Sequence, residues 1–585
     1  MNTDDVVFQK FKSSDLVNNH LIPPTDQRGG GLALFWKADI ELIVLNSCKN
    51  YIDTTLRYEG KVFYATFIYG DTDIVKRRQI WRELAKLAAL REGVWFVIGD
   101  FNDILNNQEK EGGVERAEGT FTDFRSFVAE CDLYDIHHPG DYLSWRGVTS
   151  AGVVRSRLDR AMANSDWFEC FASGHSEYLN YEGSNHKPII TCFDVTRKKG
   201  KGLFRFDRRL KNNPLVKEIV ANAWKGPRGE EVSQKITRVR GAIVKWNKEQ
   251  QGNSRTIIEK RKEELEEAMV SPQNDGDRIA SINQELKETY KAEEEYWRQR
   301  SRILWLSLGD MNSGYFHFIT KGRRAMNNIT VMEDSDGVVH YKETEISNTI
   351  VNYFTDLFTS KEEERDHIVE VALSPLVTEE MNMALIRVPS ANEIRDALFS
   401  IHSDKAPGPD GFSAGFFQTN WTSISGEIIA EIQGFFESGR MPSGINETHV
   451  RLIPKVHGPR SVADYRPIAL CNVYYKIISK LLTKRLHPIL NELISENQSA
   501  FVPNRAISDN VLITHEVLHF LKTSKASKKC YMAVKTDMSK AYDRLEWSFI
   551  EIVLRRLGFH EKWVEITMQC VSSVSFSFLM NGTAK

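Results

Sequence analysis

Trp95-Phe-Val-Ile-Gly-Asp-Phe-Asn102 is the stretch that decides the fold of the N-terminal part of this 585-residue chain. Residues 94–98 are a continuous apolar run, which predicts a buried strand, and this strand ends in Gly-Asp-Phe-Asn. Upstream, residues 61–69 are β-branched and aromatic and predict a second strand. A helix predicted over residues 75–91 separates the two strands. Strands on both sides of a helix indicate a layered α/β sandwich.

Three short motifs in residues 1–195 carry the side chains that phosphodiester hydrolysis requires. That reaction needs a positioned water, a base, a metal to neutralise charge and donors for the phosphate. Asp100 is suited to orient or deprotonate a water, and Asn102 is suited to donate to phosphate oxygens. His186, in Gly-Ser-Asn-His-Lys-Pro, is a second donor, and Asp159 lies in the third motif, Arg-Leu-Asp-Arg.

Each of these residues also has an ordinary structural explanation. Asp100 fits a turn, and His186 fits an exposed surface position. Asp159 fits an ion pair with Arg157 or Arg160. Taken one at a time, the motifs favour these explanations over a catalytic site.

Residues 196–345 combine a basic segment with a helical one and predict a linker. Eight lysines and arginines and one acid lie between Arg197 and Lys211, which suits either contact with DNA or RNA or a solvated linker. Residues 235–305 predict two long charged helices with a break at residues 271–276. The second helix has one apolar stripe, formed by Ile279, Ile282, Leu286, Tyr290 and Trp297. We expect a helical hairpin that acts as a spacer.

Residues 346–585 alternate predicted helices with short strands. Residues 530–537 predict a strand that delivers Asp537 at its end, and an amphipathic helix closed by Gly558 follows it. Nucleotidyl transfer needs carboxylates on rigid elements to hold two Mg²⁺ ions, and Asp537 suits that role. Tyr542 is placed to lie under a sugar and exclude a 2′-hydroxyl. The alternative for Asp537 is a cap of the following helix.

Two cations upstream form a pair of the kind that binds a triphosphate. Lys455 ends Leu-Ile-Pro-Lys, and Arg466 lies in Asp-Tyr-Arg-Pro-Ile-Ala-Leu. Arginine forks onto phosphate oxygens, while lysine acts as a point charge. The segment Lys-Ala-Pro-Gly-Pro-Asp-Gly at residues 405–411 predicts a stiff turn. Gln-Ser-Ala-Phe-Val-Pro-Asn-Arg at residues 498–505 predicts a loop that enters a capped helix.

These C-terminal motifs, in this order, resemble the reverse transcriptase of LINE-type (non-LTR) retrotransposons, particularly the plant type. The resemblance implies part of the fingers and palm of such an enzyme. It makes Asp537 a metal ligand and Tyr542 the sugar gate. It also implies that Lys455 and Arg466 contact a deoxynucleoside triphosphate, with RNA and DNA as template, primer and target.

The N-terminal motifs resemble the endonuclease/exonuclease/phosphatase family in its apurinic-endonuclease-like form. The resemblance implies a four-layer α/β sandwich, here partial, with a Mg²⁺-dependent nuclease site. It carries a catalytic role onto five residues of this chain: Asp100, Asn102, Asp159, His186 and Tyr69. The last of these, in Phe-Ile-Tyr-Gly, matches a family tyrosine near the phosphate.

The chain also departs from both families. It opens downstream of the family strands that bear an Asn and a metal-binding Glu. Asn185 stands where the nuclease family has an Asp that would favour the charged form of the histidine, which an amide cannot do. No Tyr-x-Asp-Asp segment follows Asp537, and the predicted strand at residues 574–580 lacks a partner after Asn581-Gly582. We expect a fragment truncated at both ends and catalytically incomplete in both sites.

Composition narrows the remaining classes of protein. No apolar run approaches the ~18 residues that span a bilayer, and the start lacks the features of a signal peptide. Seven cysteines form no CxxC pair, so we expect an intracellular protein with no zinc site, nuclear by its resemblance. Two alternatives stay open. One is a non-catalytic protein that binds nucleic acid, and the other is an interaction protein that uses the helices of residues 235–305.

Overall fold

The computed structural model of the chain forms two units. The first comprises Met1–Lys201, Arg300–Ile350 and Leu452–Arg466, and the second Gly202–Gln299, Val351–Arg451 and Pro467–Lys585. The structure describes residues 18–23, 31–58, 60–149, 152–171, 174–181, 183–193, 202–227, 229–249, 254–270, 276–301, 327–360, 366–456, 458–524 and 531–585. Residues 197–201 of the basic segment and residues 271–275 of the helix break therefore lie outside the described residues.

A six-stranded mixed sheet forms the centre of the first unit. Its strands, in spatial order, are β3 (Glu41–Cys48), β4 (Tyr51–Tyr58), β5 (Lys61–Tyr69), β6 (Trp95–Asp100), β11 (Asp159–Asn164) and β8 (Leu133–Asp135). β5 and β6 are parallel, joined through α2 (Ile74–Ala89), and the other neighbours are antiparallel. The two strands and the helix predicted from the sequence are confirmed within a few residues.

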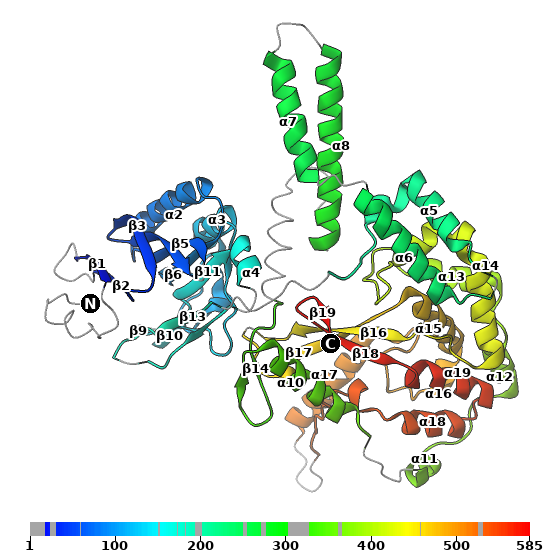
Figure 1. Cartoon of the computed structure of the whole chain (residues 1–585). Coiled ribbons are helices and arrows are strands. Elements are labelled where there is room, and N and C mark those ends of the chain that lie inside the picture. Colours follow the sequence, from blue (N-terminus) through cyan, green and yellow to red (C-terminus); the bar gives the residue numbers. More distant parts are fainter. Residues whose placement is uncertain are drawn as a thin grey trace. The chain divides into compact units, whose positions relative to one another are not determined.

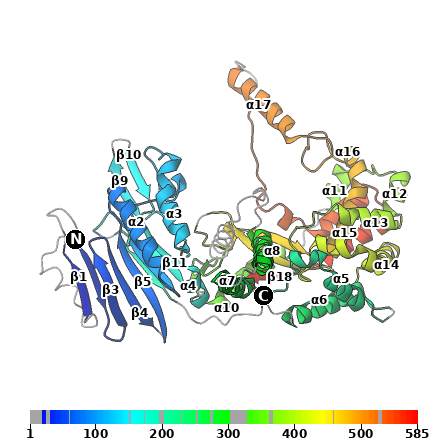
Figure 2. The ribbon, with the colours of Figure 1, turned by 90° about the horizontal axis from the view of Figure 1, so that it is seen from above.

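The two faces of this sheet have separate cores. On one face, α2 and α3 (Thr122–Glu130) pack against the strands through Trp81, Phe124 and Phe127 (Figure 2). On the other face, Phe63, Phe96 and Ala161 pack with α4 (Ser165–Cys170) and with Ile189 of β13 (Ile189–Cys192). β13 pairs with β12 (His175–Tyr178). Helices on one side and further strands on the other give the layered α/β arrangement that the sequence predicts.

Short strands complete the first unit. They form a pair, β1 (Asn18–Ile22) and β2 (Leu32–Trp36), a three-stranded sheet of β7 (Lys110–Glu111), β10 (Gly152–Ser156) and β9 (Trp145–Thr149), and a pair, β14 (Met332–Glu333) and β15 (Val339–His340). The 3-10 turn Asn107–Glu109 precedes β7.

The second unit is mainly helical. Its helices in chain order are α5 (Pro214–Trp224), α6 (Val232–Glu249), α7 (Ser254–Val270), α8 (Gly276–Ser301), α11 (Asp366–Ala372), α12 (Glu379–Ile386), α13 (Ala391–Phe399), α14 (Ala414–Ser438), α15 (Val473–Leu486), α16 (Leu490–Leu493), α17 (Ile507–Thr523), α18 (Trp547–Arg556) and α19 (Glu561–Ser572). The residues of α10 (Glu343–Phe358) are divided between the two units. The buried centre of α14, including Phe416, Ile428 and Phe435, packs in one core with side chains of α5, α6, α13, α15 and α19. This core is the largest in the chain's described part.

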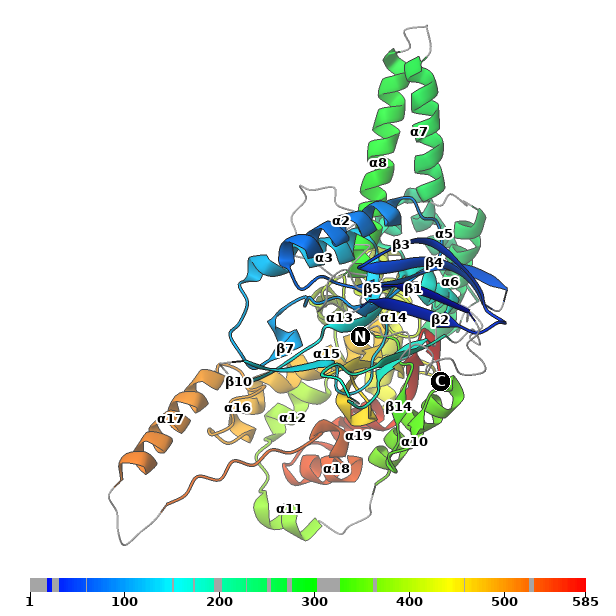
Figure 3. The same cartoon turned by 90° about the vertical axis from the view of Figure 1, so that its left-hand side faces the viewer.

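The first of the two long helices predicted over residues 235–305 is wrong as a single helix, because the structure divides it between α6 and α7. Ile236 and Val239 of α6 pack in the core of the second unit. α7 and α8 form the predicted hairpin and lie side by side in Figures 1 and 3. Ile282 and Leu286 of the predicted apolar stripe are buried against Ile258 and Ala268 of α7. Arg261 of α7 also pairs with Glu285 of α8 at 2.9 Å. The stripe therefore closes the hairpin on itself.

Residues 574–580 form β18 (Ser575–Met580), as predicted, but the predicted lack of a partner is wrong. β18 forms a hairpin with β19 (Thr583–Ala584), and Phe578 exchanges two 2.9 Å backbone bonds with Lys585. Asn581 and Gly582 hold φ angles of 50° and 93°, the signs that a type I′ turn requires. β18 also pairs in parallel with β16 (Glu447–Pro454), whose other neighbour is β17 (Tyr465–Cys471).

The strand predicted over residues 530–537 is not formed. Cys530 lies outside the described residues, and residues 531–538 are exposed without regular secondary structure. A β-prone run becomes a strand only where a neighbouring strand completes its hydrogen bonds. β16 already lies between β17 and β18, so those positions beside it are taken.

The amphipathic helix predicted after this segment is present, but it begins at Trp547 and not directly after the segment that carries Asp537. It is α18, preceded by a 3-10 turn over Tyr542–Arg544 and followed by Gly558 at φ +88°. Glu546 occupies the N-cap position of α18. The alternative of Asp537 as a helix cap is therefore wrong.

Candidate active site

Three side chains of the six-stranded sheet meet at one edge. β5 and β6 end together there, and β11 begins there, so the strand register pairs Tyr69 with Asp100 and Asp100 with Asp159. Alternate residues of a strand share a face. All three therefore lie on the face that packs against β12 and β13, the face of Phe67 and Ala161.

The glycine of Gly-Asp-Phe-Asn allows the close approach of β5 and β6 at this edge. Gly99 has φ +145°, and a Cβ atom there would lie 2.0 Å from the carbonyl oxygen of Ile68. Only glycine is tolerated at such a position. The motif therefore fixes the place of Asp100 beside Tyr69 through its backbone as well as through its side chains.

His186 reaches the same edge from the loop that precedes β13. A β-bridge to Trp145 and a 2.9 Å bond from the Arg146 amide to the Asn185 carbonyl hold this loop. His186 Nδ1 lies 2.9 Å from Asp159 Oδ2. The His186 side chain remains 30% exposed, whereas that of Asp159 is 12% exposed, so the imidazole stays within reach of a substrate.

The ionisable groups at this edge shift one another's pKa values. Burial, and then the negative charge of Asp159, raises the pKa of Asp100 to about 6. Burial lowers the pKa of His186, but the hydrogen bond and charge of Asp159 outweigh burial, so the pKa of His186 is raised overall. Burial also raises the pKa of the Tyr69 phenol, with the charge of Asp100 adding to it. The site thus holds a carboxylate that titrates near neutrality and a histidine biased toward its charged form.

Asn102 is part of the same cluster but is occupied within it. It has φ +50°, and its amide nitrogen Nδ2 donates to the Gly70 carbonyl at 2.8 Å and to Asp100 Oδ2 at 3.0 Å. Its backbone N–H donates to Asp100 Oδ1 at 2.8 Å. In this arrangement Asn102 orients Asp100, and the predicted donation to phosphate would require one of these bonds to open.

Asp100, Asp159 and His186 also form a candidate metal site. Each offers a ligand atom, and these atoms all lie within 4.8 Å of one another. The two carboxylates suit a divalent cation, which would relieve their mutual repulsion. The imidazole of His186 could bind it only in its neutral form. The residues present therefore fit a metal ion of the kind that the sequence implies.

The role predicted for position 185 is wrong. His186 is oriented by the Asp159 carboxylate, and Asn185 contributes only its backbone carbonyl, which accepts from Arg146. The Asn at this position therefore removes no carboxylate from the histidine. The alternative that Asp159 pairs with Arg157 or Arg160 is also wrong, since both arginines pair with Glu109 and Asp135.

Ser144 is a residue of this site that the sequence did not reveal. It is fully buried, and its hydroxyl accepts hydrogen bonds from the amides of Leu158 and Asp159 at 3.0 and 2.9 Å. Its carbonyl accepts from the amide of Lys187 at 2.8 Å. Ser144 thus ties the start of β11 to the residue after His186. A serine between Leu143 and Trp145 gives no sequence signal of this role.

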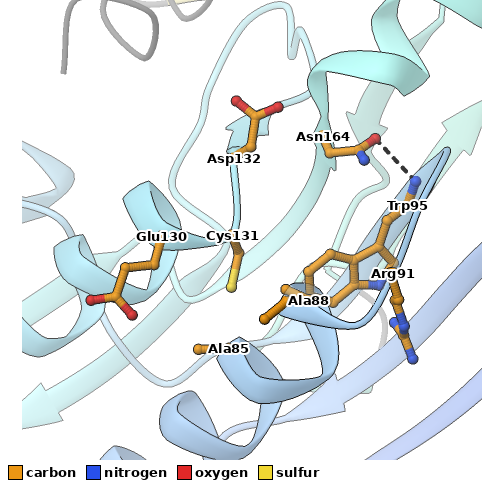
Figure 4. A pocket seen from close by; sticks show the side chains of 9 residues that line it. Ala85, Ala88, Arg91, Trp95, Glu130, Cys131, Asp132 and Asn164 are labelled. Atoms are coloured by element: carbon orange, nitrogen blue, oxygen red, sulfur yellow. Dashed lines mark hydrogen bonds between the residues drawn. The ribbon is translucent and has the colours of Figure 1, made fainter. Parts of the chain in front are cut away.

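A separate pocket of about 310 Å³ lies at the other end of β6 (Figure 4). It is lined by Ala85, Ala88, Ala89, Arg91, Trp95, Glu130, Cys131, Asp132 and Asn164. Several of its polar groups already bond within the fold: Arg91 pairs with Asp53, and Asn164 Oδ1 accepts from the Trp95 amide. Trp95 opens the strand that Asp100 ends, so this pocket is distinct from the edge that carries Asp100, Asp159 and His186.

The polymerase-like residues are arranged differently from the nuclease residues. Lys455 and the segment before Arg466 lie side by side, since the Lys455 amide donates to the Asp464 carbonyl at 2.7 Å, and both cations are exposed. Lys455 Nζ donates to the Ala463 carbonyl at 2.8 Å. Asp537 and Tyr542 are exposed in the second unit.

Two family profiles match the chain in the regions just described. The endonuclease/exonuclease/phosphatase family matches residues 3–186, and the reverse transcriptase (RNA-dependent DNA polymerase) family matches residues 453–583. The chain therefore carries a nuclease-type α/β domain of the first family and a reverse transcriptase domain of the second.

The chain is similar in sequence to proteins of transposable elements. The transposon TX1 uncharacterized 149 kDa protein of Xenopus laevis is 23% identical over 533 residues, which cover 87% of this chain and 40% of that protein. The Pol polyprotein of the type-2 retrotransposable element R2DM of Drosophila melanogaster is 29% identical over 189 residues, or 32% of this chain and 17% of that protein. The chain is homologous to the polyproteins of non-LTR retrotransposons, and it spans less than half the length of these relatives.

Solved structures similar to the chain cover about a third of it. The endonuclease domain of TRAS1, a telomere-specific non-LTR retrotransposon, is 15% identical, covers 31% of this chain and 81% of that one, and has a TM-score of 0.23. A beta toxin of Staphylococcus aureus with bound magnesium ions is 14% identical, covers 33% of this chain and 79% of that one, and has a TM-score of 0.21. Within the described residues, no helix has the length and apolar character needed to cross a membrane.

Proposed function

We propose that the nuclease half of this chain hydrolyses a phosphodiester bond of nucleic acid with the help of Mg²⁺. The observation that carries this proposal is the meeting of Asp100, Asp159 and His186 within 4.8 Å at one sheet edge. Nucleic acid as the substrate follows from the two families to which the domains belong.

The chemistry divides among these side chains. A bound Mg²⁺ would neutralise charge on the phosphate and be held by Asp100 and Asp159. Asp100, in its carboxylate form, orients the attacking water and accepts its proton. His186, held charged by Asp159, donates to the phosphate oxygen on which charge develops. Tyr69, whose pKa is raised, stays protonated as a second donor beside Asp100.

Asn185 gives no reason to regard the nuclease site as incomplete, because Asp159 supplies the carboxylate that His186 needs. The incompleteness of this site stays a prediction. One assay separates the two outcomes.

Plasmid nicking is that assay. We expect the chain to nick supercoiled DNA in Mg²⁺ and not in EDTA, and His186→Ala to lower the rate at least about 100-fold because a charged donor is lost. His340→Ala is a matched control, since His340 Nε2 forms a similar 2.8 Å pair with Asp334 away from the cluster.

Its outcomes are distinct. Nicking that persists in His186→Ala would contradict the proposed site. A parent chain that binds DNA but does not nick it would favour the non-catalytic alternative.

For the polymerase half, we propose that this chain does not synthesise DNA by itself. Asp537 is exposed on a segment without regular structure, whereas a two-metal site needs several carboxylates on rigid elements. We expect no Mg²⁺-dependent extension of a primer on an RNA template. Extension that disappears in Asp537→Asn would show that Asp537 is a working metal ligand after all.

A further inference from the structure

Tyr178 links the layer that carries His186 to the strand that carries Asp159. It is the last residue of β12, which pairs with β13, and His186 lies just before β13. Its phenol donates a hydrogen bond to the main-chain carbonyl of Asp159 at 2.5 Å. Its ring packs on the imidazole of His138, with centroids 4.0 Å apart. The Tyr178 hydroxyl therefore bonds to the backbone of Asp159, a residue of the proposed nuclease site.

The backbone of Asp159 is held by side chains at both its polar groups. The Ser144 hydroxyl accepts from its N–H at 2.9 Å, and the Tyr178 hydroxyl donates to its C=O. The peptide planes on either side of a residue set the direction of its Cα–Cβ bond. These two bonds thus set the angle at which the Asp159 carboxylate meets His186.

The next residue anchors the opposite face of the strand. Arg160 is fully buried toward Phe124, on the helix face of the sheet, and pairs with Glu109 and Asp135. The ion pairs of Arg160 hold β11 on one face only, so its first residue, Asp159, can still rotate about the strand axis. Tyr178 restrains that first residue from the other face.

We propose that Tyr178 is a positioning residue, whose hydroxyl holds Asp159 so that its carboxylate stays in hydrogen-bond contact with His186. This inference rests on the proposed nuclease function and deepens it. A positioning residue acts on turnover more than on binding, because a small misplacement of reacting groups slows the chemical step.

The test compares two tyrosine-to-phenylalanine variants of the full chain. Tyr178→Phe removes the hydroxyl and keeps the ring. Tyr134→Phe is the matched control: it removes a buried hydroxyl that donates to Asp132 at 2.7 Å, remote from the cluster. Two quantities are measured. One is kcat and KM for plasmid nicking in Mg²⁺, and the other is the NMR signal of the His186 Nδ1–H proton in ¹⁵N-histidine-labelled chain, assigned by its loss in His186→Gln.

We expect Tyr178→Phe to lower kcat about tenfold with KM within about twofold. We also expect the His186 Nδ1–H signal to broaden or move upfield, because its bond to Asp159 is no longer held. Tyr134→Phe should leave kcat and the His186 Nδ1–H signal unchanged. We expect Tyr178→Phe and Tyr134→Phe each to lower thermal stability. The proposal is overturned if Tyr178→Phe matches Tyr134→Phe in the NMR signal. If the parent chain fails to nick, the proposed function fails, while the NMR comparison still decides the role of Tyr178.

Discussion

We expect Asp100→Asn to abolish Mg²⁺-dependent nicking and at the same time to stabilise the metal-free first unit at pH 7. Loss of activity is expected at about 10³-fold or more, since the residue is proposed to orient and deprotonate the water. The gain in stability follows from the electrostatics of the edge. Burial and the charge of Asp159 disfavour the Asp100 carboxylate, so the folded chain pays for keeping it ionised.

The sign and size follow from the pKa. The pKa of Asp100 rises from 3.8 to about 6, so the folded state holds its proton more tightly than the unfolded state. The free energy of unfolding of the first unit therefore falls as pH rises from about 4 to above 6. The fall is at most about 3 kcal/mol, at 1.36 kcal/mol per pH unit. Asparagine removes this charge but loses one of the bonds to Asn102, worth about 1 kcal/mol. A net gain of about 1–2 kcal/mol remains.

Thermal unfolding in EDTA measures this gain, at about 2–4 °C per kcal/mol for a domain of this size. The advantage of the variant should shrink at pH 4, where the parent carboxyl is protonated. Asp103→Asn is the opposite control, because Asp103 is buried between Arg77 and Arg116 and its charge is paired. It should destabilise the unit. An Asp100→Asn chain that melts below the parent at pH 7 would contradict the proposed electrostatics.

Local sequence patterns predicted the elements that carry the nuclease site. The apolar run that ends at Asp100, the β-branched run that ends at Tyr69 and the helix between them are all present. Asn581-Gly582 likewise predicted a turn, because its φ angles depend on those two residues alone. Such signals need no knowledge of distant parts of the chain.

The features that the sequence did not predict depend on how distant segments of the chain pair with one another. The carboxylate that bonds to His186 belongs to Asp159, 27 positions earlier in the chain. Asp159 rather than residue 185 takes this role because β11 pairs with β6 in the register that places Asp159 beside Asp100. The segment before Asp537 has the composition of a strand, yet residues 531–538 remain unpaired by any strand of the described sheet. Composition reveals a tendency to form a strand, and a neighbouring strand decides whether it forms.

Arg160→Met is expected to cause a large loss of stability in the first unit. Arg160 is completely buried and pairs with Glu109 and with Asp135 at 3.2 Å. Methionine fills a similar volume but leaves these two acids with only Arg157, whose Nη2 lies 3.2 Å from Asp135. Removing one member of a buried ion cluster costs about 3–5 kcal/mol, because two largely buried carboxylates are then left to share one arginine.

The melting temperature of the first unit measures this loss, with Arg57→Met as the control. Arg57 pairs with Glu41 at 3.2 Å, but both side chains are more than half exposed, so its removal should cost less than about 1 kcal/mol. Adding Glu109→Gln to Arg160→Met should restore part of the stability, since it removes the stranded charge. If the two arginine variants melted alike, or if the double variant were worse than the single one, the cluster would owe its stability to packing instead. Recovery in the double variant would show that the cost lies in an unpaired carboxylate beneath the strand that begins with Asp159.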